Sequence, residues 1–146
     1  MLLRSPSKAC DAMAEPRPEW LAEVGGADGL FNWFGYWPSF HDAEILSLEL
    51  NRTGESTLSV KTWEIANEVD IQGYYVLRKH VTVHFLLEGI SNLELTGFSV
   101  QNVIFGLEIA RSDDGFRLEL DPCYGLAGSL TTAKLRVKIE PDLQGA

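Results

Sequence analysis

Residues 34–45 read FGYWPSFHDAEI, and they come directly before the first run of alternating apolar residues in the chain. The segment concentrates aromatic side chains, each of which can bury about 150–250 Å². Gly35 and Pro38 add turn-forming positions between them. We therefore expect this segment to anchor the fold at the entrance to a β-strand.

Apolar and polar residues alternate after this segment, which is typical of strands with one buried face. The expected strands cover residues 46–50, 58–65, 79–88, 93–95, 103–109, 116–120 and 131–140, with Gly89 ending the third. Asp114-Gly115 predicts a hairpin turn at residues 112–115. The alternating sets expected to share a face are Leu46, Leu48 and Leu50; Val81, Val83, Phe85 and Leu87; Val103, Phe105, Leu107 and Ile109; and Ala133, Leu135, Val137 and Ile139.

About seven strands at this spacing, without a helix long enough for parallel crossovers, predict an antiparallel sheet. The expected fold class is α+β and β-rich, with a strongly curved sheet that forms a sandwich or an open barrel. Two short helical pieces are expected between residues 19 and 34, interrupted by Gly25-Gly26, with Asp28 capping the second. Residues 19–146 form one expected domain, and the composition of residues 1–18 predicts a disordered leader.

The formal net charge of −9 bears on the class of partner. Nucleic acids and anionic membranes require basic faces, so neither is an expected partner, whereas a basic protein is suited to this charge. No stretch approaches the roughly 20 apolar residues of a membrane span, and the N-terminus lacks the apolar core of a secretory signal. Cys10 and Cys123 lie far apart and away from other metal ligands, which predicts a reduced, cytoplasmic chain without metal or cofactor.

The histidines are the first candidates for catalysis or metal binding. His41 and Asp42 could form a general base with its orienting carboxylate, but neighbours on an extended chain point to opposite faces. We expect both side chains to hydrogen-bond to backbone instead. His80 and His84 share a face of one expected strand about 13 Å apart, which is too far to hold one metal ion.

Residues 63–75 are the best candidate for a functional surface. They read WEIANEVDIQGYY between two expected strands, which is longer than a minimal hairpin connection and predicts a structured excursion. Loops held by a rigid sheet often carry function, and aromatic anchors are frequent in protein interfaces. The candidate partner-binding residues are Glu64, Glu68, Asp70, Tyr74 and Tyr75. An ordinary solvated charge cluster next to the core is an equal alternative for this segment.

Outward-facing charges on the last strand have a structural explanation. Lys134, Arg136 and Lys138 alternate along it, and acidic residues occupy outward positions on other strands. Cross-strand ion pairs, or protection of an edge strand, account for this basic row without a ligand.

The order Gly-x-Trp-Pro-Ser-Phe-His-Asp-Ala-Glu at residues 35–44 resembles the immunity protein 50 family, and residues 101–104 also fit that family's pattern. The resemblance implies a small bacterial protein that neutralises a partner toxin encoded beside it. It transfers no catalytic or toxin-contacting residue. Its structural signature here comprises Trp37, Pro38, Phe40, His41 and Asp42.

The sequence thus predicts a non-catalytic immunity protein that binds its toxin through an acidic surface containing aromatic residues. Two alternatives stay open. A closed sheet could enclose a small molecule, as many β-barrels do. A hydrolase could use His41 with carboxylates from distant positions, which requires an open cleft around that histidine.

Overall fold

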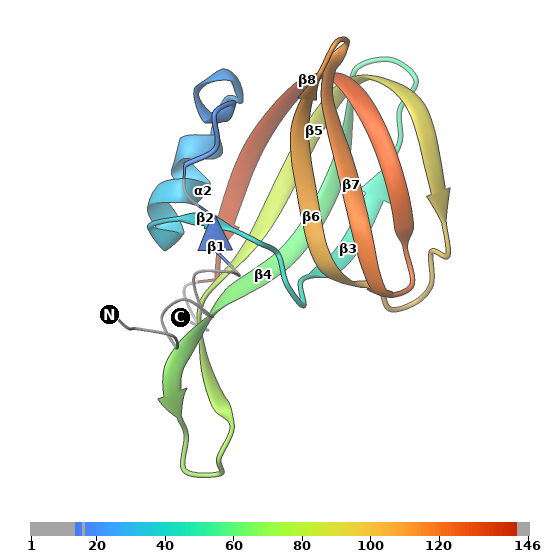
Figure 1. Ribbon diagram of the computed structural model, residues 1–146. Coiled ribbons are helices and arrows are strands. Elements are labelled where there is room, and N and C mark those ends of the chain that lie inside the picture. Colours follow the sequence, from blue (N-terminus) through green and yellow to red (C-terminus); the bar gives the residue numbers. More distant parts are fainter. Residues whose placement is uncertain (1–13, 16, 143–146) are drawn as a thin grey trace.

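Six antiparallel strands form a closed barrel in the computed structural model, which describes residues 14–15 and 17–142 (Figure 1). Their order around the barrel is β3-β4-β5-β8-β7-β6. The bounds are β3 (Glu44–Glu49), β4 (Glu55–Val69), β5 (Tyr75–Thr96), β6 (Val103–Ser112), β7 (Gly115–Tyr124) and β8 (Ala127–Pro141). The predicted β-rich antiparallel fold is confirmed, and the sheet closes rather than forming a sandwich.

The barrel closes along a short seam between β3 and β6. These strands share a single paired position, Glu44 opposite Val103. Backbone bonds beside it complete the seam: the Ile45 N–H donates to the Asn102 carbonyl (2.8 Å) and the Ile104 N–H donates to the Ala43 carbonyl (3.0 Å). The seam therefore forms where the aromatic segment enters β3.

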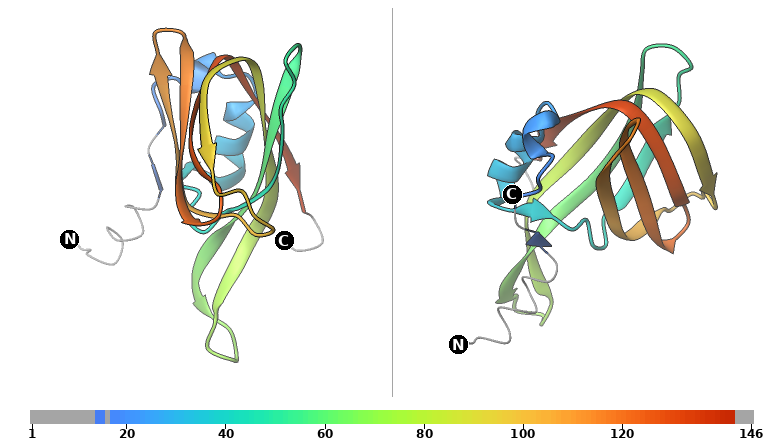
Figure 2. Two further views of the ribbon diagram at one scale, coloured as in Figure 1. Left: turned by 90° about the vertical axis from the view of Figure 1, so that its right-hand side faces the viewer. Right: turned by 45° about the horizontal axis from the view of Figure 1, so that its top comes forward.

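An N-terminal layer covers one side of the barrel (Figure 2). It contains η1 (Leu21–Glu23), α2 (Ala27–Phe34) and a small sheet of β1 (Ala14–Glu15) with β2 (Trp37–Pro38). The two predicted helical pieces are confirmed, but Asp28 is not the cap. Gly26 is the N-cap of α2 with φ +83°, and no side chain caps the helix.

Aromatic rings connect this layer to the barrel core. Trp20 meets Trp37 edge-to-face with centroids 5.0 Å apart, and Trp37 meets Phe40 at 6.2 Å. Phe40 continues to Phe85 in β5 at 5.7 Å. The aromatic segment is thus the link between the helices and the buried face of the sheet.

The predicted buried face of residues 81–87 is confirmed, since Val81, Val83, Phe85 and Leu87 are all buried. Gly89, however, does not end the strand. It adopts φ +75° and bends β5, which continues to Thr96 and includes the predicted strand 93–95. The predicted hairpin turn at residues 112–115 is present between β6 and β7.

Three predicted alternations are wrong at particular positions. A register shift between Ile45 and Ser47 buries Ile45 and leaves Leu46 and Leu50 exposed. Shifts at the start of β6 likewise turn Phe105 outward. The physical reason is the β-bulge, which adds a residue to one strand and reverses the faces beyond it.

The third wrong alternation lies in β8. Thr132 faces the core in place of Ala133, which is exposed. Ala133 lies opposite the bend at Gly89, where a Cβ atom on the glycine would come within 2.9 Å of the alanine Cβ. Both strands therefore change face together at this bend.

Beyond the barrel, β4 and β5 continue alone as a projecting two-stranded hairpin (Figure 2). Pairing of β4 with β3 ends at Lys61, and pairing of β5 with β8 begins at Val81. We call residues 62–80 the arm. The excursion predicted at residues 63–75 is therefore two extended strands joined by a short turn at residues 70–74.

The predicted leader, residues 1–18, lies largely outside the part of the chain that the structure describes, as does Cys10. Of its described positions, Ala14–Glu15 form β1, and the Arg17 guanidinium lies 4.4 Å from the centre of the Phe31 ring. Among the described residues, no helix is long and apolar enough to cross a membrane.

Candidate functional site

The signature segment places His41 on the surface between two residues in the left-handed region. Phe40 has φ +64° and Asp42 has φ +65°, which is uncommon for residues other than glycine. The His41 Nδ1 atom lies 3.2 Å from the Phe105 carbonyl oxygen, which is the backbone contact that the sequence predicts. Trp37 and Pro38, by contrast, are buried.

The expectation that His41 and Asp42 point apart is wrong. The positive φ of Asp42 turns the chain, and its Oδ2 atom lies 3.6 Å from the His41 Nε2 atom. The imidazole stacks on the exposed Phe105 ring, with centroids 5.9 Å apart. No three His, Cys, Asp or Glu residues cluster to hold a metal ion anywhere in the described ranges.

A second histidine contact, which sequence reasoning missed, resembles a hydrolase triad. The His84 Nδ1 atom lies 2.8 Å from the Ser59 hydroxyl, and its Nε2 atom lies 2.9 Å from a Glu140 carboxylate oxygen. Ser59 is only 7% exposed, and β4 is paired on both sides at this position. The Ser59 hydroxyl is therefore nearly enclosed within the sheet, which leaves little room for a substrate beside it. The contact ties β4, β5 and β8 together.

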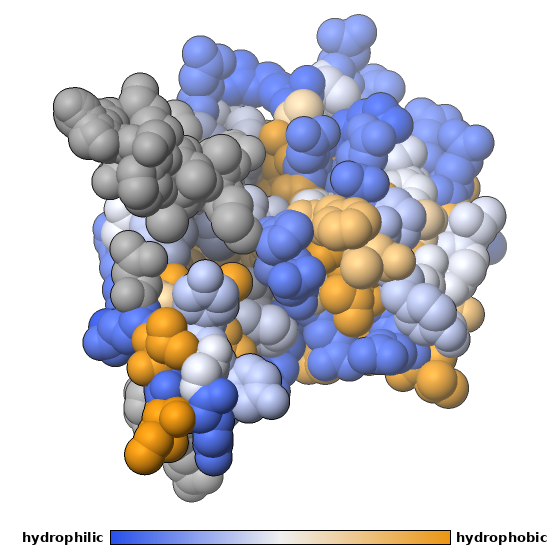
Figure 3. All heavy atoms as spheres, turned by 60° about the horizontal axis from the view of Figure 1, so that its bottom comes forward, coloured by the Kyte–Doolittle hydropathy of each residue, from blue (hydrophilic) through white to orange (hydrophobic). Residues whose placement is uncertain are grey.

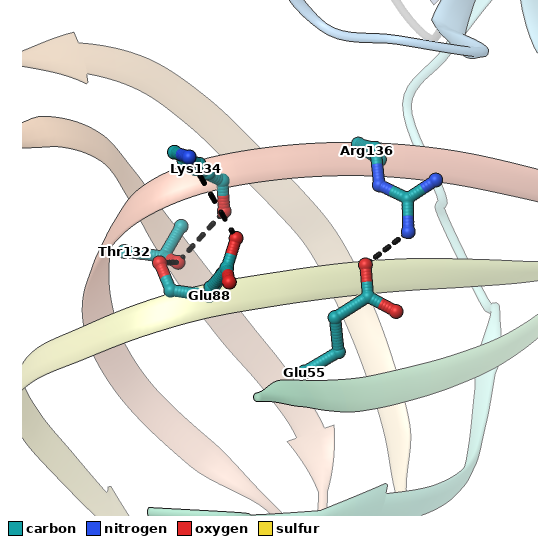
Figure 4. A network of polar contacts seen from close by, with 5 residues as sticks. All are labelled: Glu55, Glu88, Thr132, Lys134 and Arg136. Carbon is teal, nitrogen blue, oxygen red and sulfur yellow. Dashed lines mark hydrogen bonds and ion pairs between the residues drawn. The ribbon is translucent and has the colours of Figure 1, made fainter. Parts of the chain in front are cut away.

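Two residues of the basic row of β8, Lys134 and Arg136, form cross-strand ion pairs, as predicted (Figure 4). Arg136 pairs with Glu55, and the Lys134 Nζ atom lies 4.0 Å from a Glu88 carboxylate oxygen. The buried Thr132 hydroxyl oxygen lies 2.9 Å from the carbonyl oxygens of both Glu88 and Lys134, and its one hydrogen donates to either of them in turn. These contacts hold the outer surface of β4, β5 and β8.

The barrel interior is filled by side chains rather than by a ligand space. Leu58, Val83 and Phe85 are among the fully buried residues that occupy it. A hollow of about 310 Å³ lies at one mouth, lined by Leu48, Leu95, Thr96, Gly97, Phe98 and Leu126. Phe98 is itself exposed, so this hollow is part of the outer surface.

The arm carries an apolar strip that is open to solvent. Ile65 is paired with Leu77, and Val69 with Tyr75, so the four side chains lie on one face. A register shift separates the two pairs, because four residues of β4 span the distance covered by two residues of β5. They are 43%, 40%, 58% and 67% exposed, respectively. Hydrophobic side chains gather on the arm in Figure 3, at the lower left. Ile71 in the turn is 99% exposed.

The predicted partner-binding residues all lie on the arm, but their carboxylates bond within the molecule. Glu68 pairs with Arg78, and one Asp70 oxygen accepts the N–H groups of Gln72 and Tyr74, both at 2.9 Å. Tyr74 and Tyr75, in contrast, are 70% and 67% exposed. The carboxylates of Glu68 and Asp70 are thus exposed but have partners within the molecule, whereas the two tyrosine rings are largely open to solvent.

Glu64 lies at the base of the arm, where the N-terminal layer meets it. It accepts a hydrogen bond from the Tyr36 hydroxyl (2.9 Å), and Lys79 Nζ lies 3.9 Å from its other oxygen. Burial raises the pKa of the Tyr36 hydroxyl well above its usual value, and the hydrogen bond and charge of Glu64 raise it further. The Trp33 Nε1–H donates to the Lys79 carbonyl (3.0 Å). The base of the arm is therefore fixed to the helical layer.

The family model for immunity protein 50 matches residues 26–139, which include α2, the signature segment, the barrel and the arm. The chain belongs to the immunity protein 50 family. No curated protein and no solved structure matches it significantly. Membership in the immunity protein 50 family indicates an immunity role, which implies a protein toxin as partner and a non-enzymatic mode of action.

Asn102 has a structural role in this member of the immunity protein 50 family. It is 3% exposed, and its Oδ1 atom accepts the N–H groups of Ser99 (2.9 Å) and Leu126 (3.0 Å). Its Nδ2 atom donates to the Ser99 carbonyl at 2.9 Å. One side chain thus fixes the connection from β5 to β6 against the start of β8.

Proposed function

We propose that this member of the immunity protein 50 family binds a cognate bacterial toxin domain through the arm and neutralises it without catalysis. The observation that carries the proposal is the exposure of Tyr74 and Tyr75 on a hairpin that projects from an otherwise packed barrel. Tyrosine supplies a large contact area at a small cost in side-chain entropy, and it is enriched among residues that dominate binding energy.

The negative charge supports capture of a basic toxin. The chain carries a net charge of −9, and opposite charges can raise association rates to about 10⁸–10⁹ M⁻¹s⁻¹ at low salt. Glu64, Glu68 and Asp70 contribute to this field even though each has a partner within the molecule. Rapid capture suits a protein that acts in the bacterial cytoplasm before the toxin can do damage.

The test is binding to the C-terminal domain of any large secreted protein that is encoded beside this chain. We expect saturable, nanomolar binding in calorimetry and loss of the toxicity of that domain when the two are co-expressed. Tyr74→Ala with Tyr75→Ala should weaken binding, whereas Leu46→Ala with Leu50→Ala provides a matched control on the exposed barrel surface. Failure of the folded wild-type protein to bind would refute the proposal.

Charge reversal tests the electrostatic part separately. Glu68→Lys with Asp70→Lys should slow association and reduce its dependence on salt, because both changes add positive charge close to the contact. Association rates measured from 50 to 500 mM NaCl would show this difference. If the rates of the variant and the wild type match at every salt concentration, these carboxylates do not steer the toxin.

A further inference from the structure

We infer that the arm docks by insertion, with its apolar strip (Ile65, Val69, Tyr75 and Leu77) and its tip entering an apolar cleft in a basic toxin domain. This inference rests on the proposed function and specifies how that binding occurs. The structure supplies three observations in its favour: the separation of apolar from charged residues on the arm, the shape of the arm, and the distribution of charge over the molecule.

Charged and apolar side chains occupy opposite faces of the arm. Glu64 is paired across the strands with Arg78, which also forms the ion pair with Glu68. Because successive residues in a strand point to opposite faces, the neighbouring Ile65–Leu77 pair lies on the other side. The charges of the arm are therefore largely neutralised by one another, while the apolar strip has no cover.

The dimensions of the arm favour a concave partner. A ribbon of two strands is about 10 Å wide, and six residues of β5 beyond the barrel extend it by about 20 Å. One such face covers about 200 Å², whereas a stable interface buries about 800 Å² on each partner. Contact with one face alone is thus too small. A cleft that also encloses the edges and the exposed Ile71 at the tip reaches the required area.

Charge disfavours a second copy of this chain as the occupant. Two copies would each bring a net charge of −9, which opposes their association. Stacking of two arms would also bury only one face of each, which leaves the contact at about a quarter of the usual area. A basic partner is attracted by the same charge. The occupant that fits both observations is a cleft in a positively charged protein.

The test compares two double variants in binding to the toxin domain encoded beside this chain. Val69→Ser with Tyr75→Ser removes the outer pair of the strip. Phe98→Ser with Val100→Ser removes a matched exposed apolar pair at the mouth of the barrel. We expect the arm variant to weaken binding at least about 100-fold, mainly through faster dissociation, and the control to change it less than about threefold. Circular dichroism and thermal unfolding would show that both variants are folded.

Cross-linking from the arm locates the contact directly. A photo-reactive phenylalanine analogue at Ile71 should cross-link to residues that line a cleft of the toxin domain, identified by mass spectrometry. Unchanged affinity of the arm variant, or cross-links only to a convex surface, would overturn the inference and leave the proposed function standing. A wild-type dimer that the arm variant converts to a monomer would assign the strip to a second copy. Absence of wild-type binding would refute both proposals.

Discussion

Asn102 offers the sharpest test of how the barrel is closed. The side-chain amide of Asn102 makes three hydrogen bonds with Ser99 and Leu126. The backbone carbonyl of Asn102 accepts the Ile45 N–H at the seam. The substitution Asn102→Ala removes the amide and keeps the backbone. The seam bond of the carbonyl is therefore retained while the side-chain bonds are lost.

The expected loss of stability depends on whether water can reach the backbone groups that lose their hydrogen bond to Asn102. The Leu126 N–H belongs to a residue that is 2% exposed, and an unsatisfied buried donor costs about 1–3 kcal/mol. Ser99 is only partly buried, so water can replace its two bonds at a smaller cost of about 0.5–1 kcal/mol together. We therefore expect Asn102→Ala to lower the free energy of unfolding by about 1.5–4 kcal/mol.

Urea denaturation followed by tryptophan fluorescence measures this difference. The midpoint should fall while the slope m stays constant, since the buried surface is nearly unchanged. Gln101→Ala is the matched control, because Gln101 is exposed and its replacement should change stability by less than about 0.5 kcal/mol. If Asn102→Ala costs no more than this control, the amide does not hold the connection and the reasoning is refuted.

Three further predictions concern the helical layer and the core. The folded state holds the Tyr36 proton more tightly than the unfolded state, because the pKa of this hydroxyl is raised on folding. The stability that the protonated Tyr36 contributes is therefore complete below about pH 10 and is lost as pH rises through the raised pKa. Urea midpoints measured from pH 8 to 11 should fall more steeply for wild type than for Tyr36→Phe. Gly26→Ala should destabilise by at least about 3 kcal/mol, since its Cβ would come within 1.9 Å of the Val137 carbonyl oxygen, whereas Gly54→Ala, with a similar φ and open space, should cost only about 1–2 kcal/mol. Phe85→Ala should cost about 3–5 kcal/mol in the same assay, and a loss below 1 kcal/mol would contradict its place in the core.

Regular alternation predicted the strands well wherever the ladder is uninterrupted. Val81, Val83 and Phe85 face the core as their period of two requires. Ile45 and Phe105 could not be assigned in the same way, because each lies beside a register shift. A bulge depends on how two strands pair, and a single strand's pattern does not contain that information.

The sequence predicted the position of the candidate surface along the chain but not the exposure of its aliphatic residues. The length of the connection at residues 63–75 drew attention to the arm, and the aromatic residues within it are exposed. The exposure of Ile65 and Leu77 was not foreseen, because apolar residues that continue a strand are normally buried with it. Contacts such as that between Ser59 and His84 require the register of β4 and β5, which only the folded chain supplies.

The position of the arm also bears on why its residues are apolar. Beyond Lys61 and Val81, neither β3 nor β8 pairs with it, so the strip makes no part of the barrel ladder. Exposed strand edges with apolar side chains promote aggregation, and proteins usually protect such edges with charges. Here the one ion pair between Glu68 and Arg78 leaves Val69 and Tyr75 uncovered. Apolar residues that carry this risk without filling a core are consistent with the proposal that a toxin buries them on binding.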